Sequence, residues 1–112
     1  MNDHNTYPPT IGCIVHYRGK LGAMAIQPAM IVTTTDTLEP GPVEAGDIPD
    51  LDTDMHVHLR VLTASEAGGY TEYNVPHVSD VAEPDLHPRW PEGPGAGTWA
   101  WRDLNRKPGG GR

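Results

Sequence analysis

Residues 50–61 read D-L-D-T-D-M-H-V-H-L-R-V, in which charged or histidine side chains occur at every second position. Because successive side chains of a strand point to opposite faces, this period predicts a half-buried β-strand with a polar outer face. That face would carry Asp50, Asp52, Asp54, His56, His58 and Arg60. The stretch therefore predicts a β fold and contains the one histidine pair with metal-ligand spacing.

The composition favours a single small domain with many loops. The chain has 112 residues, of which 37% are hydrophobic and none is phenylalanine. Its 13 glycines and 12 prolines leave little room for long helices. We expect one domain over residues 11–102, between a flexible arm at 1–10 and a disordered basic tail at 103–112.

Four further segments have strand-like patterns. They are residues 11–18, 25–35, 70–75 and 98–102. The alternating strand is expected to end near Thr63, and Gly68 and Gly69 supply the positive φ values of a tight hairpin after it. Five short strands in this order predict an all-β, small, partly open five-stranded barrel of the SH3-like kind, with the OB-like kind as the alternative.

Two segments rich in proline and glycine, residues 36–49 and 77–97, are expected to be long loops. The first is acidic and should be exposed. The second is predicted to contain at most a minor helical turn near 79–83, and Leu86 and Trp90 are its candidate anchors.

The charge is unevenly distributed along the chain. The formal net charge is −7, but residues 1–88 hold 13 acidic and three basic residues, whereas residues 89–112 hold five basic and two acidic ones. An acidic body repels nucleic acid and anionic membrane surfaces. We therefore expect neither DNA nor a membrane as a partner.

Cys13 is the single cysteine, so no internal disulfide can form. Its apolar neighbours Ile14 and Val15 favour a buried small side chain over a catalytic thiol. No apolar run approaches the length of a membrane span, and the first residues lack a signal-peptide pattern. These features predict a soluble cytoplasmic protein.

His56 and His58 are two residues apart on one predicted strand face, a spacing that occurs in zinc sites. Asp54 or His77 would be the further ligand. A convincing site needs three or four convergent ligands, which the sequence does not locate. A solvated strand face is therefore the favoured interpretation, and no cofactor is predicted.

Five aromatic residues form a candidate binding wall. They are Tyr70, Tyr73, Trp90, Trp99 and Trp101. On an SH3-like barrel such a wall binds proline-rich peptides or flat rings. Trp99 and Trp101 share one predicted face, however, and large aromatic side chains mostly serve burial, which is the favoured role here.

No catalytic motif is found in the sequence. The run G-P-G-A-G at residues 93–97 follows no strand and opens no helix, so it is no phosphate loop. Ser65 and Ser79 lack the context of a nucleophile elbow. The chain is therefore predicted not to be an enzyme.

Five short pieces occur in a distinctive order along the chain. They are I-V-H-Y (14–17), P-A-M-I-V (28–32), V-H-L-R-V (57–61), N-V-P (74–76) and G-T-W-A-W (97–101). This order, with its terminal G-T-W-x-W motif, resembles a group of small proteins of actinobacterial phages and prophages. The chain departs from the group in its longer 77–97 loop and in lacking proline after Trp101. The resemblance implies a phage or prophage origin and assigns no site.

The leading hypothesis is a non-catalytic, phage-encoded accessory protein that binds a partner in the infected cell. A protein partner, from host or phage, is favoured, because the acidic segment 36–54 would steer a basic patch toward it. A small nucleotide would need local cations, for which the candidates are Arg18, Lys20, Arg60 and Arg102. The alternatives are a virion protein (head decoration or tail-associated) and a metal-binding protein using His56 and His58. A homo-oligomer formed through the sheet edges is a further prediction.

Overall fold

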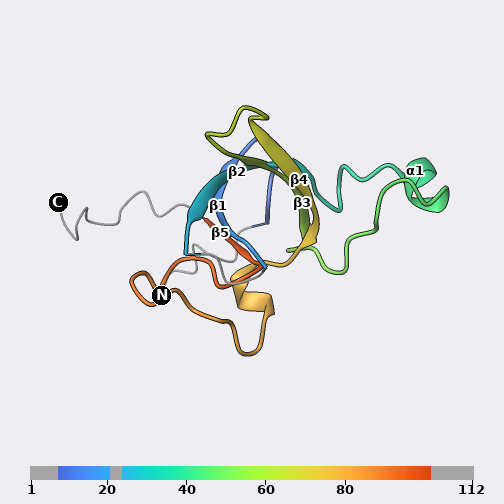
Figure 1. The fold of residues 1–112 in the computed structure, drawn as a ribbon. Coiled ribbons are helices and arrows are strands. Elements are labelled where there is room, and N and C mark those ends of the chain that lie inside the picture. The colour runs from blue at the N-terminus through green and yellow to red at the C-terminus, as the bar shows by residue number, and fades with distance from the viewer. Residues whose placement is uncertain (1–7, 21–23, 102–112) are drawn as a thin grey trace.

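The computed structural model describes residues 8–20 and 24–101. Figure 1 shows the strands arranged around a ring, with a short helix projecting from it. The elements are β1 (Ile14–Arg18), β2 (Ile26–Thr33), α1 (Pro40–Glu44), β3 (Val57–Leu62), β4 (Gly69–Val75), η2 (Val78–Asp80) and β5 (Trp99–Trp101). The predicted arm at 1–10 lies largely outside the described residues, and Arg102 and the predicted tail at 103–112 lie wholly outside them.

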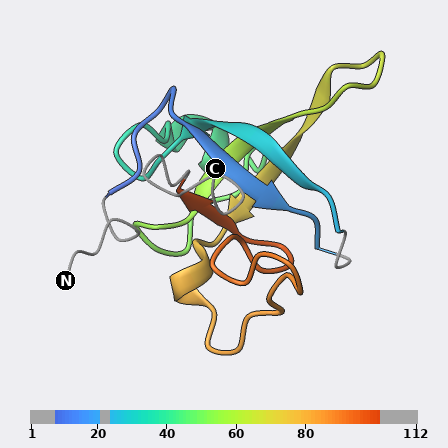
Figure 2. The same cartoon turned by 90° about the vertical axis from the view of Figure 1, so that its left-hand side faces the viewer.

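All five strands belong to one antiparallel sheet with the order β4-β3-β2-β1-β5. Strands β1 to β4 follow each other as a meander, and β5 returns to the free edge of β1. The sheet curves but is not closed (Figures 1 and 2). The prediction of an all-β fold with five strands is confirmed.

The hydrophobic core lies on the concave face of this sheet. Tyr17 of β1 pairs with Trp99 of β5, and Leu59 of β3 pairs with Ile31 of β2, so each pair stands side by side on that face. The buried core residues are Val15, Tyr17, Ala29, Ile31, Val57, Leu59, Val61, Val75 and Trp99. One continuous apolar layer therefore holds the five strands together.

The two edges of the sheet meet at one point beyond β4. His77 forms an isolated parallel bridge with Trp99 of β5, and the Trp99 amide donates to the Pro76 carbonyl at 3.1 Å. The rings of His77 and Trp99 pack edge to face at 4.6 Å, and both residues are fully buried. The His77 ring also accepts a hydrogen bond from the Ser79 amide at the start of η2. This contact joins the edges that the ladder leaves open.

The prediction that the alternating strand begins at Asp50 is wrong, because β3 begins at Val57. Backbone amides of the residues before Val57 donate to a side chain and to a turn carbonyl instead of to a neighbouring strand. The Leu51 amide donates to the Asp50 carboxylate at 2.8 Å, and the His56 amide donates to the Thr53 carbonyl at 3.0 Å. Asp and Thr side chains compete with ladder hydrogen bonds in this way, so residues 50–56 form a loop despite their alternation.

Of the six residues predicted for the polar outer face of the third strand, only His58 and Arg60 lie in β3. Arg60 is exposed, as expected, but His58 is only 2% exposed. The Tyr73 ring and the Pro49 carbonyl both contact the His58 ring. A loop and the neighbouring strand therefore bury a position that the pattern assigns to solvent.

Other boundaries differ by a few residues. Strand β1 begins at Ile14 instead of residue 11, and the predicted acidic loop 36–49 contains the short helix α1, which starts at a proline. Proline suits the first helical turn because its missing N–H would have no partner there. The minor turn predicted near 79–83 is present as η2.

The hairpin between β3 and β4 depends on its glycines. Gly68 and Gly69 have φ values of 78° and 146°, as the sequence predicted for a tight turn. A Cβ atom at Gly69 would collide with the Val61 carbonyl oxygen. Only glycine fits this close approach of two backbones.

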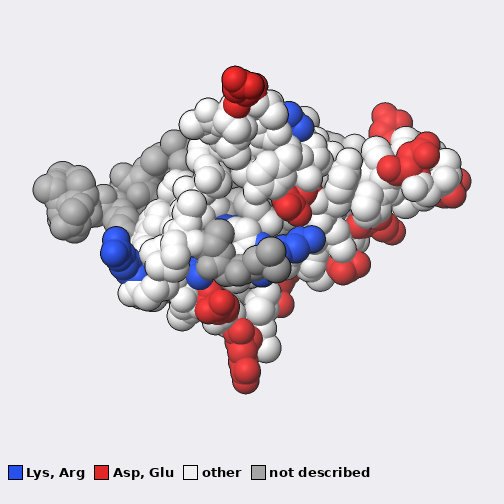
Figure 3. All heavy atoms as spheres, in the orientation of Figure 1, with Lys and Arg blue, Asp and Glu red and all other residues white. Residues whose placement is uncertain are grey.

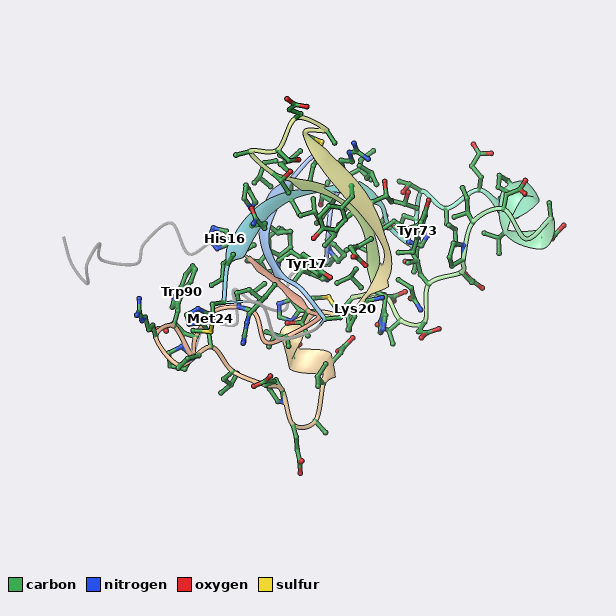
Figure 4. The ribbon with its side chains drawn as sticks, viewed as in Figure 1. His16, Tyr17, Lys20, Met24, Tyr73 and Trp90 are labelled. Atoms are coloured by element: carbon green, nitrogen blue, oxygen red, sulfur yellow. The ribbon has the colours of Figure 1, made fainter. Side chains whose placement is uncertain are left out.

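The 77–97 loop packs onto the sheet through its own contacts. Trp90 lies against His16 of β1 (Figure 4), and their ring centroids are 5.1 Å apart. A Cβ at Gly93 would press on the Trp90 ring. Buried Arg18 donates to the Asp85 carbonyl at 2.7 Å. Leu86, the other predicted anchor, is 46% exposed, so it does not anchor the loop.

Replacing Trp90 with alanine is expected to loosen the 77–97 loop, because the Trp90 ring packs on both His16 and Gly93. Limited proteolysis of the full chain should cut this loop about tenfold faster in Trp90→Ala than in the wild type. Leu86→Ala removes an exposed side chain from the same loop and serves as the matched control. Equal cleavage of the two variants would contradict the anchoring role of Trp90.

His77 should make the fold sensitive to acid. Burial lowers the pKa of His77 from its ordinary 6.5 to about 4, against the opposing effect of Asp80. Below pH 6.5 the unfolded chain therefore takes up a proton that the folded chain does not, and the free energy of unfolding falls by roughly 3 kcal/mol on the way to pH 4. Above pH 6.5 this contribution vanishes.

Urea denaturation across this pH range measures that loss. His77→Asn keeps an acceptor for the Ser79 amide and removes the ionisable ring, so its stability should depend less steeply on pH. If the variant has the same pH slope as the wild type, His77 is not the group responsible.

Candidate functional site

The most prominent surface feature is an acidic projection between β2 and β3, which we call the acidic arm (residues 36–54). It holds seven carboxylates and no lysine or arginine: Asp36, Glu39, Glu44, Asp47, Asp50, Asp52 and Asp54. Helix α1 forms its outer part and contains no buried residue. Figure 3 shows the acidic side chains spread over this projection. The arm is therefore a concentrated negative surface held away from the core.

His58 of β3 holds the end of the acidic arm that leads back to the sheet. Its Nδ1 accepts a hydrogen bond from the Asn74 amide at 2.9 Å, so its Nε2 carries the proton and donates to the Pro49 carbonyl at 3.0 Å. Burial lowers the pKa of His58, and the Pro49 carbonyl and Asp50 oppose that shift. A neutral ring with both nitrogens engaged thus ties the arm to β4.

Asn74 continues this connection from β4 to the arm. Its side-chain oxygen accepts from the Asp52 amide at 3.0 Å, and its side-chain nitrogen donates to Asp52 Oδ2 at 3.1 Å. Asn74 has a φ of 54°, the left-handed region that asparagine tolerates better than most residues. The positive φ accompanies a register shift between β3 and β4, so the bulge turns Asn74 toward the arm.

A second group of polar side chains ties the arm to η2. The Thr53 hydroxyl donates to Asp80 Oδ2 at 2.8 Å and therefore accepts from His56 Nδ1 at 2.7 Å. His56 Nδ1 also lies 3.8 Å from Asp80 Oδ2, and His56 Nε2 lies 4.0 Å from Asp52 Oδ2. The two carboxylates thus flank the His56 ring on both sides. This cluster and the His58 network together hold residues 49–53, which we call the stem of the arm.

A pocket of about 380 Å³ opens where the two ends of the acidic arm meet. Its lining residues are Pro8, Pro9, Thr34, Thr35, Asp36, Asp54 and Met55. The Thr35 hydroxyl donates to Asp54 Oδ1 at 3.1 Å. The Met55 carbonyl accepts from the Trp99 indole at 2.9 Å, so one wall of the pocket is anchored to the core. Acidic, hydroxyl-bearing and apolar residues thus line one hollow.

The five aromatic residues predicted to form a wall lie in separate places. Trp99 is buried in the core, with Trp101 packed edge to face on it at 5.1 Å. Trp90 lies on the convex face of β1, and Tyr73 packs on His58 at the side of the arm (Figure 4). Tyr70 is exposed on the edge strand β4. The structure brings only Trp99 and Trp101 into contact with each other.

The cations proposed for a nucleotide are also dispersed. Arg60 donates to the Thr71 hydroxyl at 3.3 Å on the convex face, and Arg18 is buried against the 77–97 loop. Lys20 Nζ lies 3.6 Å from Glu72 Oε1. Burial, together with the same Glu72 and Tyr70, raises the pKa of Tyr17. Among the described residues these cations do not share one site.

The predicted metal pair is likewise engaged in other contacts. Both ring nitrogens of His58 form hydrogen bonds, whereas His56 lies in the loop before β3 and faces Thr53. Over residues 8–20 and 24–101, no three or more His, Cys, Asp or Glu side chains are placed to hold a metal ion. Cys13 lies partly buried against the core.

Sequence reasoning missed Asn74 and the pocket residues Pro8, Pro9 and Thr35. Its residue type could have indicated Asn74, because asparagine is common at positive φ and in turns. The pocket has no local signal, since its residues come from three separate segments of the chain.

Asn74 offers a direct test of the stem. Asn74→Gly and Asn74→Ala both lose the hydrogen bonds to Asp52, but alanine must also adopt the left-handed φ, which costs roughly 1 kcal/mol more. We therefore expect alanine to lower the free energy of unfolding further than glycine, as measured by urea denaturation. An alanine variant as stable as the glycine variant would show that the positive φ carries no strain.

Comparisons with protein-family models, with curated proteins and with solved structures gave no match for this chain. In the described part of the chain, no helix has the length and apolar character needed to cross a membrane. The function proposed below therefore rests on the charge, burial and contacts of the described residues.

Proposed function

We propose that this chain is a non-catalytic binding protein, encoded by a phage and acting in the infected cell, whose acidic arm binds a basic segment of a protein partner. The observation that carries the proposal is the arm itself: seven carboxylates without a cation, on a projection whose stem is held by side-chain hydrogen bonds. The phage origin is supported by the order of the sequence motifs, including the terminal G-T-W-A-W.

The electrostatics of the arm favour a basic protein partner over other classes. Like charges gathered on one projection create a negative potential that steers a positive partner and raises its association rate. The same potential repels nucleic acid. Because exposed charges are screened beyond about 8 Å at physiological salt, the attraction should weaken as salt rises.

Two histidines of the described chain, His58 and His87, are used in a way that fits a binding protein. His58 and His87 each have one ring nitrogen accepting from a backbone amide and the other bonded to a backbone carbonyl. A ring bound on both sides holds loops in place and has no nitrogen left for proton transfer to a substrate. This supports a structural use of these rings.

We further propose that the sheet is an SH3-like barrel. The support is a four-strand meander whose fifth strand returns beside the first. A 3-10 turn lies at the start of the connection from β4 to that strand, and the His77–Trp99 bridge joins the edges. In this arrangement the acidic arm is the connection between the second and third strands. A virion role would use the same arm, and the presence of the protein in purified particles would distinguish it from a role in the infected cell.

Charge removal on the arm tests the proposed function. We expect Glu44→Gln/Asp47→Asn to weaken binding of a lysine-rich peptide about threefold at low salt, because two exposed carboxylates no longer attract it. Fluorescence anisotropy of the labelled peptide measures this with the full chain. The control Glu66→Gln/Glu83→Gln makes the same change in net charge outside the arm.

The control variant should bind nearly as well as the wild type. Equal weakening by the two double variants would mean that net charge alone attracts the peptide. No binding of the peptide at low salt would refute the proposed function.

A further inference from the structure

We propose that the pocket at the base of the acidic arm receives one arginine side chain of the partner, with the guanidinium group held by Asp36 and Asp54. This inference rests on the proposed function and adds a specific anchor to it. The arm attracts basic segments in general, whereas the pocket would select one residue of such a segment.

The position of the two carboxylates suits a bridging cation. Asp36 and Asp54 are the first and last residues of the arm, and both line the pocket, so two separate chain segments each bring an acidic residue to one hollow. The rest of the arm's carboxylates lie between them along the chain. A cation bound here would also offset the repulsion between the two ends of the arm.

The Asp54 carboxylate is oriented before any ligand arrives. Its Oδ1 accepts a hydrogen bond from the Thr35 hydroxyl at 3.1 Å, which leaves Oδ2 for a ligand. Thr34, beside it in the pocket wall, is buried and is fixed by the Thr37 hydroxyl, which accepts from the Thr34 amide at 2.8 Å. A positioned carboxylate loses little side-chain entropy when it binds.

The remaining walls favour arginine over lysine. Pro8, Pro9 and Met55 supply apolar surface beside the carboxylates. A guanidinium group is planar, weakly hydrated and able to donate to two carboxylates at once, and its aliphatic stem packs on apolar surface. A lysine ammonium is strongly hydrated and would lose more on entering such a pocket.

The ligand set of the pocket favours an organic cation over a calcium ion. At about 380 Å³ the pocket has room for one arginine side chain. Two carboxylates supply few of the roughly six to eight oxygen ligands that Ca²⁺ takes. The described residues place no third His, Cys, Asp or Glu with them. A single organic cation is therefore the best match.

Three lysine-rich peptides that differ at one central residue test the inference with the unmodified full chain. That residue is arginine, lysine or citrulline, the last being a neutral shape mimic of arginine. We expect the arginine peptide to bind about tenfold tighter than the lysine peptide, and citrulline to bind most weakly. In NMR spectra, only the arginine peptide should shift the amide signals of Thr35 and Met55.

Variants separate the pocket from the rest of the arm. Asp36→Asn/Asp54→Asn should reduce the affinity for the arginine peptide to that for the lysine peptide. Glu44→Gln/Asp47→Asn, farther out on the arm, should weaken all three peptides and preserve the preference for arginine.

The outcomes distinguish the two proposals. Equal binding of the arginine and lysine peptides, with shifts confined to the outer arm, would overturn the pocket assignment and leave the proposed function intact. Binding of none of the peptides would refute the proposed function and the pocket assignment together.

Discussion

Trp99 joins the two edges of the sheet to the base of the acidic arm. Its backbone pairs with Tyr17 of β1 and receives the bridge from His77, while its indole donates to the Met55 carbonyl. The last described strand thus connects β1, the chain beyond β4 and the loop before β3. Burying this large side chain is also a major part of the hydrophobic stabilisation of a core without phenylalanine.

That junction allows a charged projection to stand on a small domain. Seven like charges on one segment repel each other and would favour an extended, mobile loop. The stem is instead held by hydrogen bonds from His58 and Asn74 on one side and from Thr53 and Asp80 on the other. Each such bond contributes about 1 kcal/mol, so together they can restrain the end of the arm that leads into β3 while α1 remains exposed.

The sequence predicted the fold well and the strand ends less well. Strand patterns, the Gly68-Gly69 hairpin and the shortage of long helices all follow from local preferences, and all are present in the structure. The alternation from Asp50 predicted a strand start seven residues too early. A period of two does not reveal which backbone amides already donate to side chains, as the Leu51 amide does. The burial of His58 depends on Tyr73 and Pro49, which only the folded chain brings near it.

The amino-acid sequence by itself determined the all-β class, the number of strands and the acidity of the segment between the second and third strands. These properties follow from side-chain period, from glycine and proline, and from charge, all of which are local. Tertiary structure alone decided that Asp36 and Asp54 border one pocket, that Trp90 packs on His16, and that Asn74 holds the arm. The reason is physical: contacts between distant segments depend on how the sheet curves and packs, and no local pattern encodes them.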